Sequence, residues 1–147
     1  MDRGVALVLT AVVGGFLALQ APMNSTLGRG VGPFQAALLS FLVGTVLLCL
    51  IASLAGGGLG RLAGLRDVPW YYLAGGVLGA AYVTNSLVAV RVLGAGGIVA
   101  ATIAGQLIAS VVVDHFGVLG IERQPITLAR VAGVLLLAAG VYLIVRD

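Results

Sequence analysis

The sequence has little charge and few of the residues that bind metals or cofactors. Only 9% of the 147 residues are charged, lysine does not occur, and there is one cysteine and one histidine. Because a soluble domain carries roughly 25% charged residues, this chain could not cover its surface in water. The single Cys49 excludes a disulfide framework and a cysteine-based metal site. Without a nucleophile elbow or a phosphate-binding loop, we predict no enzyme activity, metal or cofactor.

The basic residues are too few and too dispersed to form a surface for nucleic acid. The formal net charge of +3 arises from eight basic residues, all of them arginine, against five acidic ones. Nucleic-acid binding requires basic residues clustered on one face, so we expect no nucleic-acid partner. Hydrophobic residues make up 61% of the chain, which indicates that its surroundings are mostly lipid.

Charged and turn-forming residues divide the chain into five apolar spans, which are residues 4–27, 33–54, 69–90, 95–113 and 126–145. Each span is near the ~20 residues with which a helix crosses ~30 Å of hydrocarbon. The connections are short, and the longest, residues 55–67, reads as a flexible glycine-rich loop. We therefore predict an all-α integral membrane protein, with a single five-helix transmembrane domain over residues 1–147. The first span is too long for a signal peptide and is expected to be retained.

The arginines are distributed unevenly between the two sides of the membrane. Five spans place the termini on opposite sides, with Arg3, Arg61, Arg66, Arg123 and Arg130 on one side and Arg29, Arg91 and Arg146 on the other. The positive-inside rule then favours a cytoplasmic amino terminus. Because the excess is small, the chain either inserts in both orientations or depends on a partner of opposite orientation.

Uncharged polar side chains lie inside three of the spans, and the candidates to bind a substrate are Gln20, Asn24, Tyr82, Asn85, Gln106 and Ser110. Gln20 and Asn24 are four residues apart, so a helix places both on one face. Pro22 lies between them, and a helix break there would mark a substrate site, as in transporters. Two alternatives remain open. Pro22 is a plain kink that aids packing, and hydroxyls such as that of Ser110 bond their own helix backbone.

The third and fourth spans also carry small residues at the spacing of helix-packing faces. Gly75 and Gly79 are separated by one turn in the third span, and the fourth span has a row formed by Gly97, Ala101, Gly105 and Ala109. Such rows allow another helix to approach closely. A polar row follows one position later along the fourth span and ends at Asp114.

Asp114 and its neighbour His115 are the candidates for a proton relay, because a carboxylate beside an imidazole can transfer protons near neutral pH. Both residues lie at the predicted membrane boundary. The alternative is therefore structural: Asp114 pairs with an arginine or caps the end of the span.

Three stretches carry a resemblance to a known family, and they read "LQAPMNSTLGRGVGPFQAALLSFLVGT", "PWYYLAGGVLGAAYV" and "VLGAGGIVAATIAGQLIASVVVDHFGVLG". Their specific parts are the Gln20 and Asn24 pair, Pro69-Trp70, and the run from Gly105 to Gly117. Over nearly the whole chain the sequence resembles the DUF606 family, also called YdcZ-like or DMT2. That family belongs to the drug/metabolite transporter superfamily of bacterial inner membranes.

The resemblance implies a five-helix half of an inverted-repeat transporter, which works as an antiparallel dimer with itself or with a related chain. The superfamily's small exporters place a glutamate in the first helix for proton coupling, and this chain has none in its first span. Our leading hypothesis is an inner-membrane small-molecule transporter or exporter subunit that acts by alternating access on a polar or weakly charged substrate. The alternative is a non-transporting scaffold or assembly subunit of the membrane.

Overall fold

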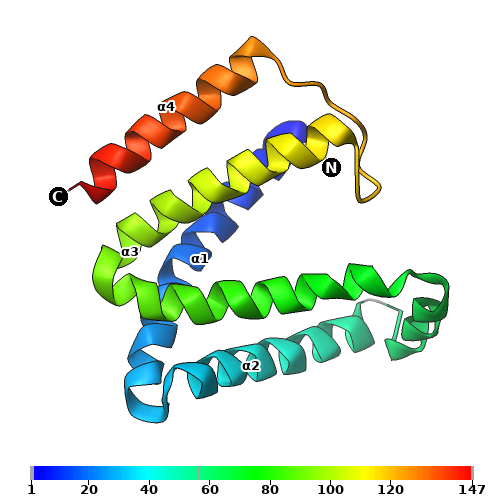
Figure 1. Cartoon of the computed structure of the whole chain (residues 1–147). Coiled ribbons are helices and arrows are strands. Elements are labelled where there is room, and N and C mark those ends of the chain that lie inside the picture. Colours follow the sequence, from blue (N-terminus) through cyan, green and yellow to red (C-terminus); the bar gives the residue numbers. More distant parts are fainter. Residues whose placement is uncertain (1, 56, 147) are drawn as a thin grey trace. The chain divides into compact units, whose positions relative to one another are not determined.

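The computed structural model describes residues 2–55 and 57–146, and every regular element within them is a helix (Figure 1). The elements in chain order are α1 (Arg3–Val31), α2 (Pro33–Leu54), the 3₁₀ helices η1 (Leu59–Asp67) and η2 (Trp70–Leu73), α3 (Ala74–Phe116) and α4 (Leu128–Val145). Four stretches are long and apolar enough to cross a membrane, namely α1, α2, Trp70–Phe116 and α4. The predicted all-α membrane class is therefore confirmed.

α1 continues through Pro22 as far as Val31, so the helix break expected at Pro22 is not found. Proline lacks one amide hydrogen and removes a single hydrogen bond within the helix, and the turns on both sides keep theirs. The Thr26 hydroxyl donates to the Pro22 carbonyl at 3.0 Å. The helix instead ends at Gly32, whose φ of 97° is easy for glycine. Pro33 then begins α2 at a position that needs no amide hydrogen.

α3 is interrupted at Gly94, where φ is 68° and ψ is 172°. This conformation is essentially restricted to glycine. The interruption separates α3 into two helical parts, residues 74–93 and 95–116, so the described chain has five long helices in total. Their bounds lie within a few residues of the five predicted spans, except that the third begins with the 3₁₀ turn η2.

The glycine-rich connection after α2 is more regular than expected. Residues 55–67 read as a flexible loop, but the 3₁₀ helix η1 occupies Leu59–Asp67. Gly57 and Gly58, with φ of 79° and 87°, make the turn before it. Glycines in the rest of the segment do not prevent i→i+3 hydrogen bonding. The expectation of a wholly flexible loop is therefore wrong.

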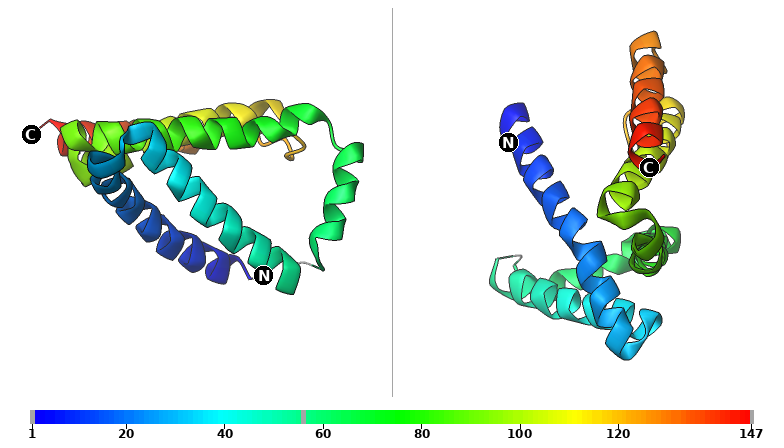
Figure 2. Two further views of the ribbon diagram at one scale, coloured as in Figure 1. Left: turned by 90° about the horizontal axis from the view of Figure 1, so that it is seen from below. Right: turned by 90° about the vertical axis from the view of Figure 1, so that its left-hand side faces the viewer.

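The chain divides into two compact units, Met1–Arg91 and Val92–Asp147. In the first unit, α1, α2 and the first part of α3 pack around a small core formed by Ala37, Val83 and Leu87. Figure 2 shows that α2 and this part of α3 diverge towards the segment that connects them. The second unit holds the rest of α3, residues 117–127 and α4. A single five-helix domain stays a prediction.

Candidate functional site

A small polar recess lies between α1 and the first part of α3. Its lining is Leu17, Gln20, Ala21, Asn24, Tyr82, Val83 and Ser86. Gln20 and Asn24 are one helical turn apart on α1, and Tyr82 and Ser86 are one turn apart on α3, so each pair faces the other helix. The recess offers about 10 Å³ for the centres of water molecules, which is room for about one water.

Asn24 connects this recess to α2. The Asn24 side chain is 8% exposed, and its Nδ2 donates to the Ser40 hydroxyl at 3.3 Å. A buried amide is costly without a hydrogen-bond partner, so this contact holds the amide in a defined orientation. Ser86, which is 4% exposed, adds a second buried polar group to the recess wall.

A larger open recess of about 220 Å³ lies on the other side of Gln20, and it is lined by Gln20, Ser40, Phe41, Gly44, Thr45 and Leu48. Gln20 lines both recesses and is half-buried. Within the described residues its amide has no hydrogen-bond partner from another side chain. An amide in this position can donate to and accept from a solute in either recess.

The structure brings together three of the predicted binding residues, Gln20, Asn24 and Tyr82. Asn85 lies on α3 but lines neither recess and is exposed. Gln106 and Ser110 belong to the second unit and are exposed there. The Ser110 hydroxyl donates to the carbonyl of Leu107 in its own helix at 2.9 Å, which is the local bond that hydroxyls form in helices.

The hydroxyl groups of Ser86 and Ser40 line the recesses, but these two residues were not among the predicted binding residues. Ser86 is one turn from Tyr82, and Ser40 lies one turn before Gly44, so both carried the same periodic signal as the amides. The partner of Asn24 on α2 could not be found from spacing, because it depends on how α1 and α2 pack.

The predicted packing glycines differ in what surrounds them. A Cβ at Gly79 would lie 3.6 Å from Cζ of Phe41 on α2, so this glycine faces a neighbouring helix. A Cβ at Gly75 or Gly105 would meet no atom within 4 Å. In the small row of α3, Gly97 is buried, whereas Ala101, Gly105 and Ala109 are exposed. Their role in packing therefore stays a prediction.

Arg91 is held against α1 one turn beyond the smaller recess. Its Nε donates to the Ser25 hydroxyl at 3.0 Å, and its Nη2 donates to the Ser25 carbonyl at 3.2 Å. The guanidinium lies close to Gly28, where a Cβ would be in van der Waals contact with Nη2 at 3.4 Å. The sequence indicated only an interfacial arginine here.

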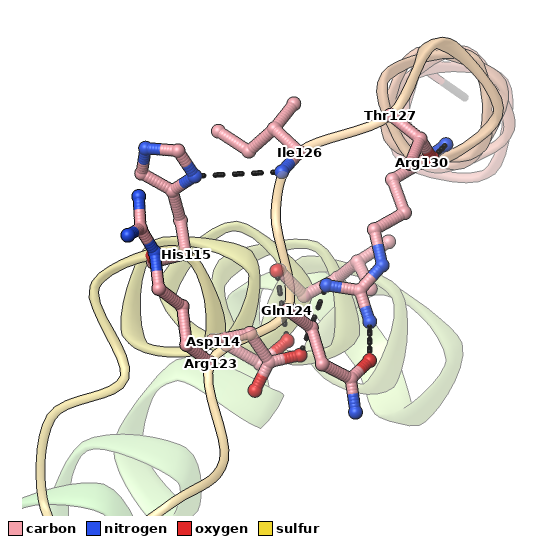
Figure 3. Close-up of polar contacts among 9 residues, drawn as sticks. Asp114, His115, Arg123, Gln124, Ile126, Thr127 and Arg130 are labelled. Atoms are coloured by element: carbon pink, nitrogen blue, oxygen red, sulfur yellow. Dashed lines mark hydrogen bonds and ion pairs between the residues drawn. The ribbon is translucent and has the colours of Figure 1, made fainter.

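Asp114 and His115 take part in a network that fixes residues 117–127 (Figure 3). The Asp114 carboxylate pairs with Nη1 of Arg130 at 3.2 Å, and Arg130 also bonds the Gln124 side chain. Nδ1 of His115 accepts from the backbone amide of Ile126 at 3.4 Å. The side chains of Asp114 and His115 point in different directions (Figure 3). The network matches the structural alternative for Asp114, and the proton relay stays a prediction.

No group of His, Cys, Asp and Glu that could hold a metal ion is found in the part of the chain that the structure describes. Apolar helices of spanning length, with polar side chains lining recesses between α1, α2 and the first part of α3, define an integral membrane protein.

The comparisons with known proteins identify the family. Residues 5–143 match the family described as "Putative inner membrane exporter, YdcZ". Over 113 residues the chain is 33% identical to "Inner membrane protein YdcZ" of Escherichia coli (strain K12). This match covers 76% of this chain and 74% of that protein. The chain therefore belongs to the YdcZ family, and it is a multi-pass protein of the bacterial inner membrane. No solved structure matches it significantly.

Family membership confirms the resemblance seen in the sequence. The family is described as one of membrane exporters, which are transporters rather than enzymes.

Proposed function

We propose that the chain is a subunit of an inner-membrane exporter for a polar or weakly charged small molecule. The observation that carries this proposal is the position of Gln20, which is half-buried between two recesses and has no side-chain partner within the described residues. An unpartnered amide inside a membrane span is costly unless water or a ligand satisfies it. Together with membership of an exporter family, this favours a site that binds solute.

Asn24, Tyr82 and Ser86 would complete the site. Asn24 is held in place by Ser40, so its carbonyl oxygen remains available to accept a hydrogen bond. Tyr82 supplies an aromatic wall, and Ser86 supplies a hydroxyl. Because no charged side chain lines either recess, the recesses themselves suit neutral hydrogen-bonding groups.

We propose further that the transporting unit is an antiparallel pair of five-helix chains that works by alternating access. No residue of α4 is buried within the second unit, and α2 buries only Ala36 and Ala37 within the first. Lipid covers some of this surface, but a second chain in the opposite orientation would also bury part of it and enclose the open recess. The thin arginine bias supports the same arrangement, since it permits both orientations.

Flux through proteoliposomes tests the proposed site. A panel of neutral and weakly charged amphipathic solutes is screened first for flux that requires the chain. We expect Gln20→Ala and Asn24→Ala to lower the flux of any responsive solute at least tenfold, which corresponds to the loss of about 1.4 kcal/mol of binding. Thr10→Ala is the matched control, because the Thr10 hydroxyl bonds only the Ala6 carbonyl of its own helix on an exposed face. Unchanged flux in both recess variants would overturn the site.

Cysteine accessibility separates a transporter from a scaffold. After Cys49→Ser, which removes the native thiol, single cysteines at positions 20, 24 and 106 are treated with a charged thiol reagent. We expect positions 20 and 24 to react, because water reaches the recesses. Gln106 belongs to the predicted site but not to the described recesses, so its reactivity reports whether the second unit also faces water. Complete protection at positions 20 and 24 from both sides of the membrane favours the scaffold.

A further inference from the structure

The positive charge of Arg91 has no ion-pair partner among the described residues. The acidic residues described in the first unit are Asp2 and Asp67, and neither forms an ion pair. Within the described residues, Arg130 and Asp114 form the one ion pair, and both belong to the second unit. The groups that bind Arg91 are a neutral hydroxyl and a neutral carbonyl of Ser25. They orient the guanidinium without cancelling its charge.

The hydrogen bonds to Ser25 occupy one edge of the guanidinium and leave another edge available. Nε and Nη2 form the side edge, and both donate to Ser25. The end edge consists of Nη1 and the second hydrogen of Nη2, and the structure records no bond from it to a described residue. Two parallel N–H groups on a fixed plane match the two oxygens of a carboxylate or phosphate. Ser25 therefore holds Arg91 in the geometry of an oxyanion receptor.

The position of Arg91 relates this receptor to the solute site. Ser25 follows Asn24 of the smaller recess directly, and Arg91 follows Ser86 by five residues. On a helix that spacing is about 7.5 Å along the axis. Arg29 lies one turn after Ser25 near the end of α1, so it adds a second positive charge to this end of the helix.

We propose that Arg91, oriented by Ser25, binds an oxyanion group, either a carboxylate or phosphate of the transported solute or the phosphate of an anionic lipid headgroup. The solute arm deepens the proposed function and rests on it. It defines the substrate as an amphipathic molecule with a neutral hydrogen-bonding part for Gln20 and Asn24 and one anionic group for Arg91. The competing explanation is a clamp, in which Arg91 only joins α3 to the carboxyl-terminal part of α1, where a positive charge is favoured.

Side-chain NMR of the full chain distinguishes these possibilities without a transport assay. The chain is labelled with ¹⁵N-arginine in nanodiscs of phosphatidylcholine, and the Nε–H signals of Arg91 and Arg29 are assigned from Arg91→Lys and Arg29→Lys. Sodium phosphate is added, with sodium chloride of equal ionic strength as the reference. In a second set of nanodiscs, phosphatidylglycerol replaces part of the phosphatidylcholine. Arg29 is the matched control, since it lies at the same end of α1 and has no fixed partner among the described residues.

We expect phosphate to move the Arg91 signal along a saturable curve, with an affinity at least tenfold tighter than at Arg29. Ser25→Ala should weaken phosphate binding about tenfold because the guanidinium loses its orientation. Arg91→Lys, labelled with ¹⁵N-lysine and followed through its Nζ signal, should also bind more weakly, because an ammonium lacks the planar fork. A shift with phosphatidylglycerol but not with free phosphate would assign the site to a lipid headgroup. An Arg91 signal that responds to neither would overturn the proposal and establish the clamp.

The NMR titration of Arg91 can succeed or fail independently of the flux assay that tests the proposed function. An anion-responsive Arg91 in a chain without flux would refute the exporter and keep the receptor. Suppose instead that flux depends on Gln20 but the Arg91 signal responds to neither phosphate nor phosphatidylglycerol. This result would refute the oxyanion site and leave the exporter proposal intact.

Discussion

At the residue scale, the hydrogen bond of Asn24 predicts a measurable stability effect. Its Nδ2 donates to Ser40 in a site where the side chain is 8% exposed. We expect Asn24→Ala to lower the free energy of unfolding by about 1 kcal/mol, because one hydrogen bond between helices is lost. Thr10→Ala should change it by less than about 0.5 kcal/mol, since Thr10 bonds its own helix at an exposed position. Chemical unfolding in mild detergent measures both values, and equal values would mean that the contact with Ser40 contributes nothing.

The Asp114–Arg130 pair gives a second prediction at this scale. The two side chains are 26% and 30% exposed, so water screens their attraction. We expect a double-mutant cycle with Asp114→Asn and Arg130→Gln to give a coupling energy of about 0.2–1 kcal/mol. If Asp114 is structural, any dependence of solute flux on the proton gradient in the native chain should persist in Asp114→Asn. Loss of that dependence with unchanged stability would instead establish the proton relay.

Side chains were predictable from the sequence where they share one helix, and less so where they depend on packing. Gln20 and Asn24 face the same recess because four residues make one turn of α1. Asn85 was a predicted binding residue, but it lies outside both recesses. Its position one residue before Ser86 turns it about 100° away. No spacing rule could show that Arg91 reaches Ser25, since 66 residues separate them.

At the scale of elements, the interruption of α3 depends on Gly94. Its φ of 68° and ψ of 172° strain any residue with a Cβ. We expect Gly94→Ala to lower the free energy of unfolding by about 1–3 kcal/mol. Gly96→Ala is the matched control two residues away in helical conformation, where a Cβ would lie 4.0 Å from the nearest neighbour, Ile144. It should be neutral or stabilise by about 0.5–1 kcal/mol. Equal effects of the two substitutions would show that the turn at Gly94 is not required.

The elements themselves were predicted closely, for a physical reason that also explains the errors. Hydrophobic length predicted the helical stretches, because a helix needs about 20 apolar residues to cross the hydrocarbon. Proline and glycine were less reliable signals. Pro22 lies within an unbroken α1, whereas Gly94 breaks α3, although neither outcome follows from composition. Proline costs one hydrogen bond, which a long helix tolerates, but a positive φ ends a helix outright.

At the scale of the whole molecule, both units expose many apolar side chains. Large apolar side chains are exposed along every long helix, and α4 buries none of its residues. Lipid accounts for apolar exposure in an inner-membrane protein, but it cannot satisfy the polar wall of the open recess that Gln20, Ser40 and Thr45 line. Water or a second chain must do so, and this links the dimer proposal to the site.

The arginine distribution then predicts how orientation responds to mutation. Arg61 and Arg66 lie in η1 and supply the excess of one side, so their replacement by alanine leaves three arginines on each side. We expect this double variant to insert more evenly in the two orientations than the native chain. Replacing Arg29 and Arg146 by alanine should have the opposite effect, because it leaves five arginines against one.

Carboxyl-terminal fusions to alkaline phosphatase, which is active outside the cytoplasm, and to green fluorescent protein, which fluoresces inside, measure the two populations. If both variants keep the ratio of the native chain, the arginines do not set the orientation. An antiparallel homodimer would then need a different cause for its inverted partner.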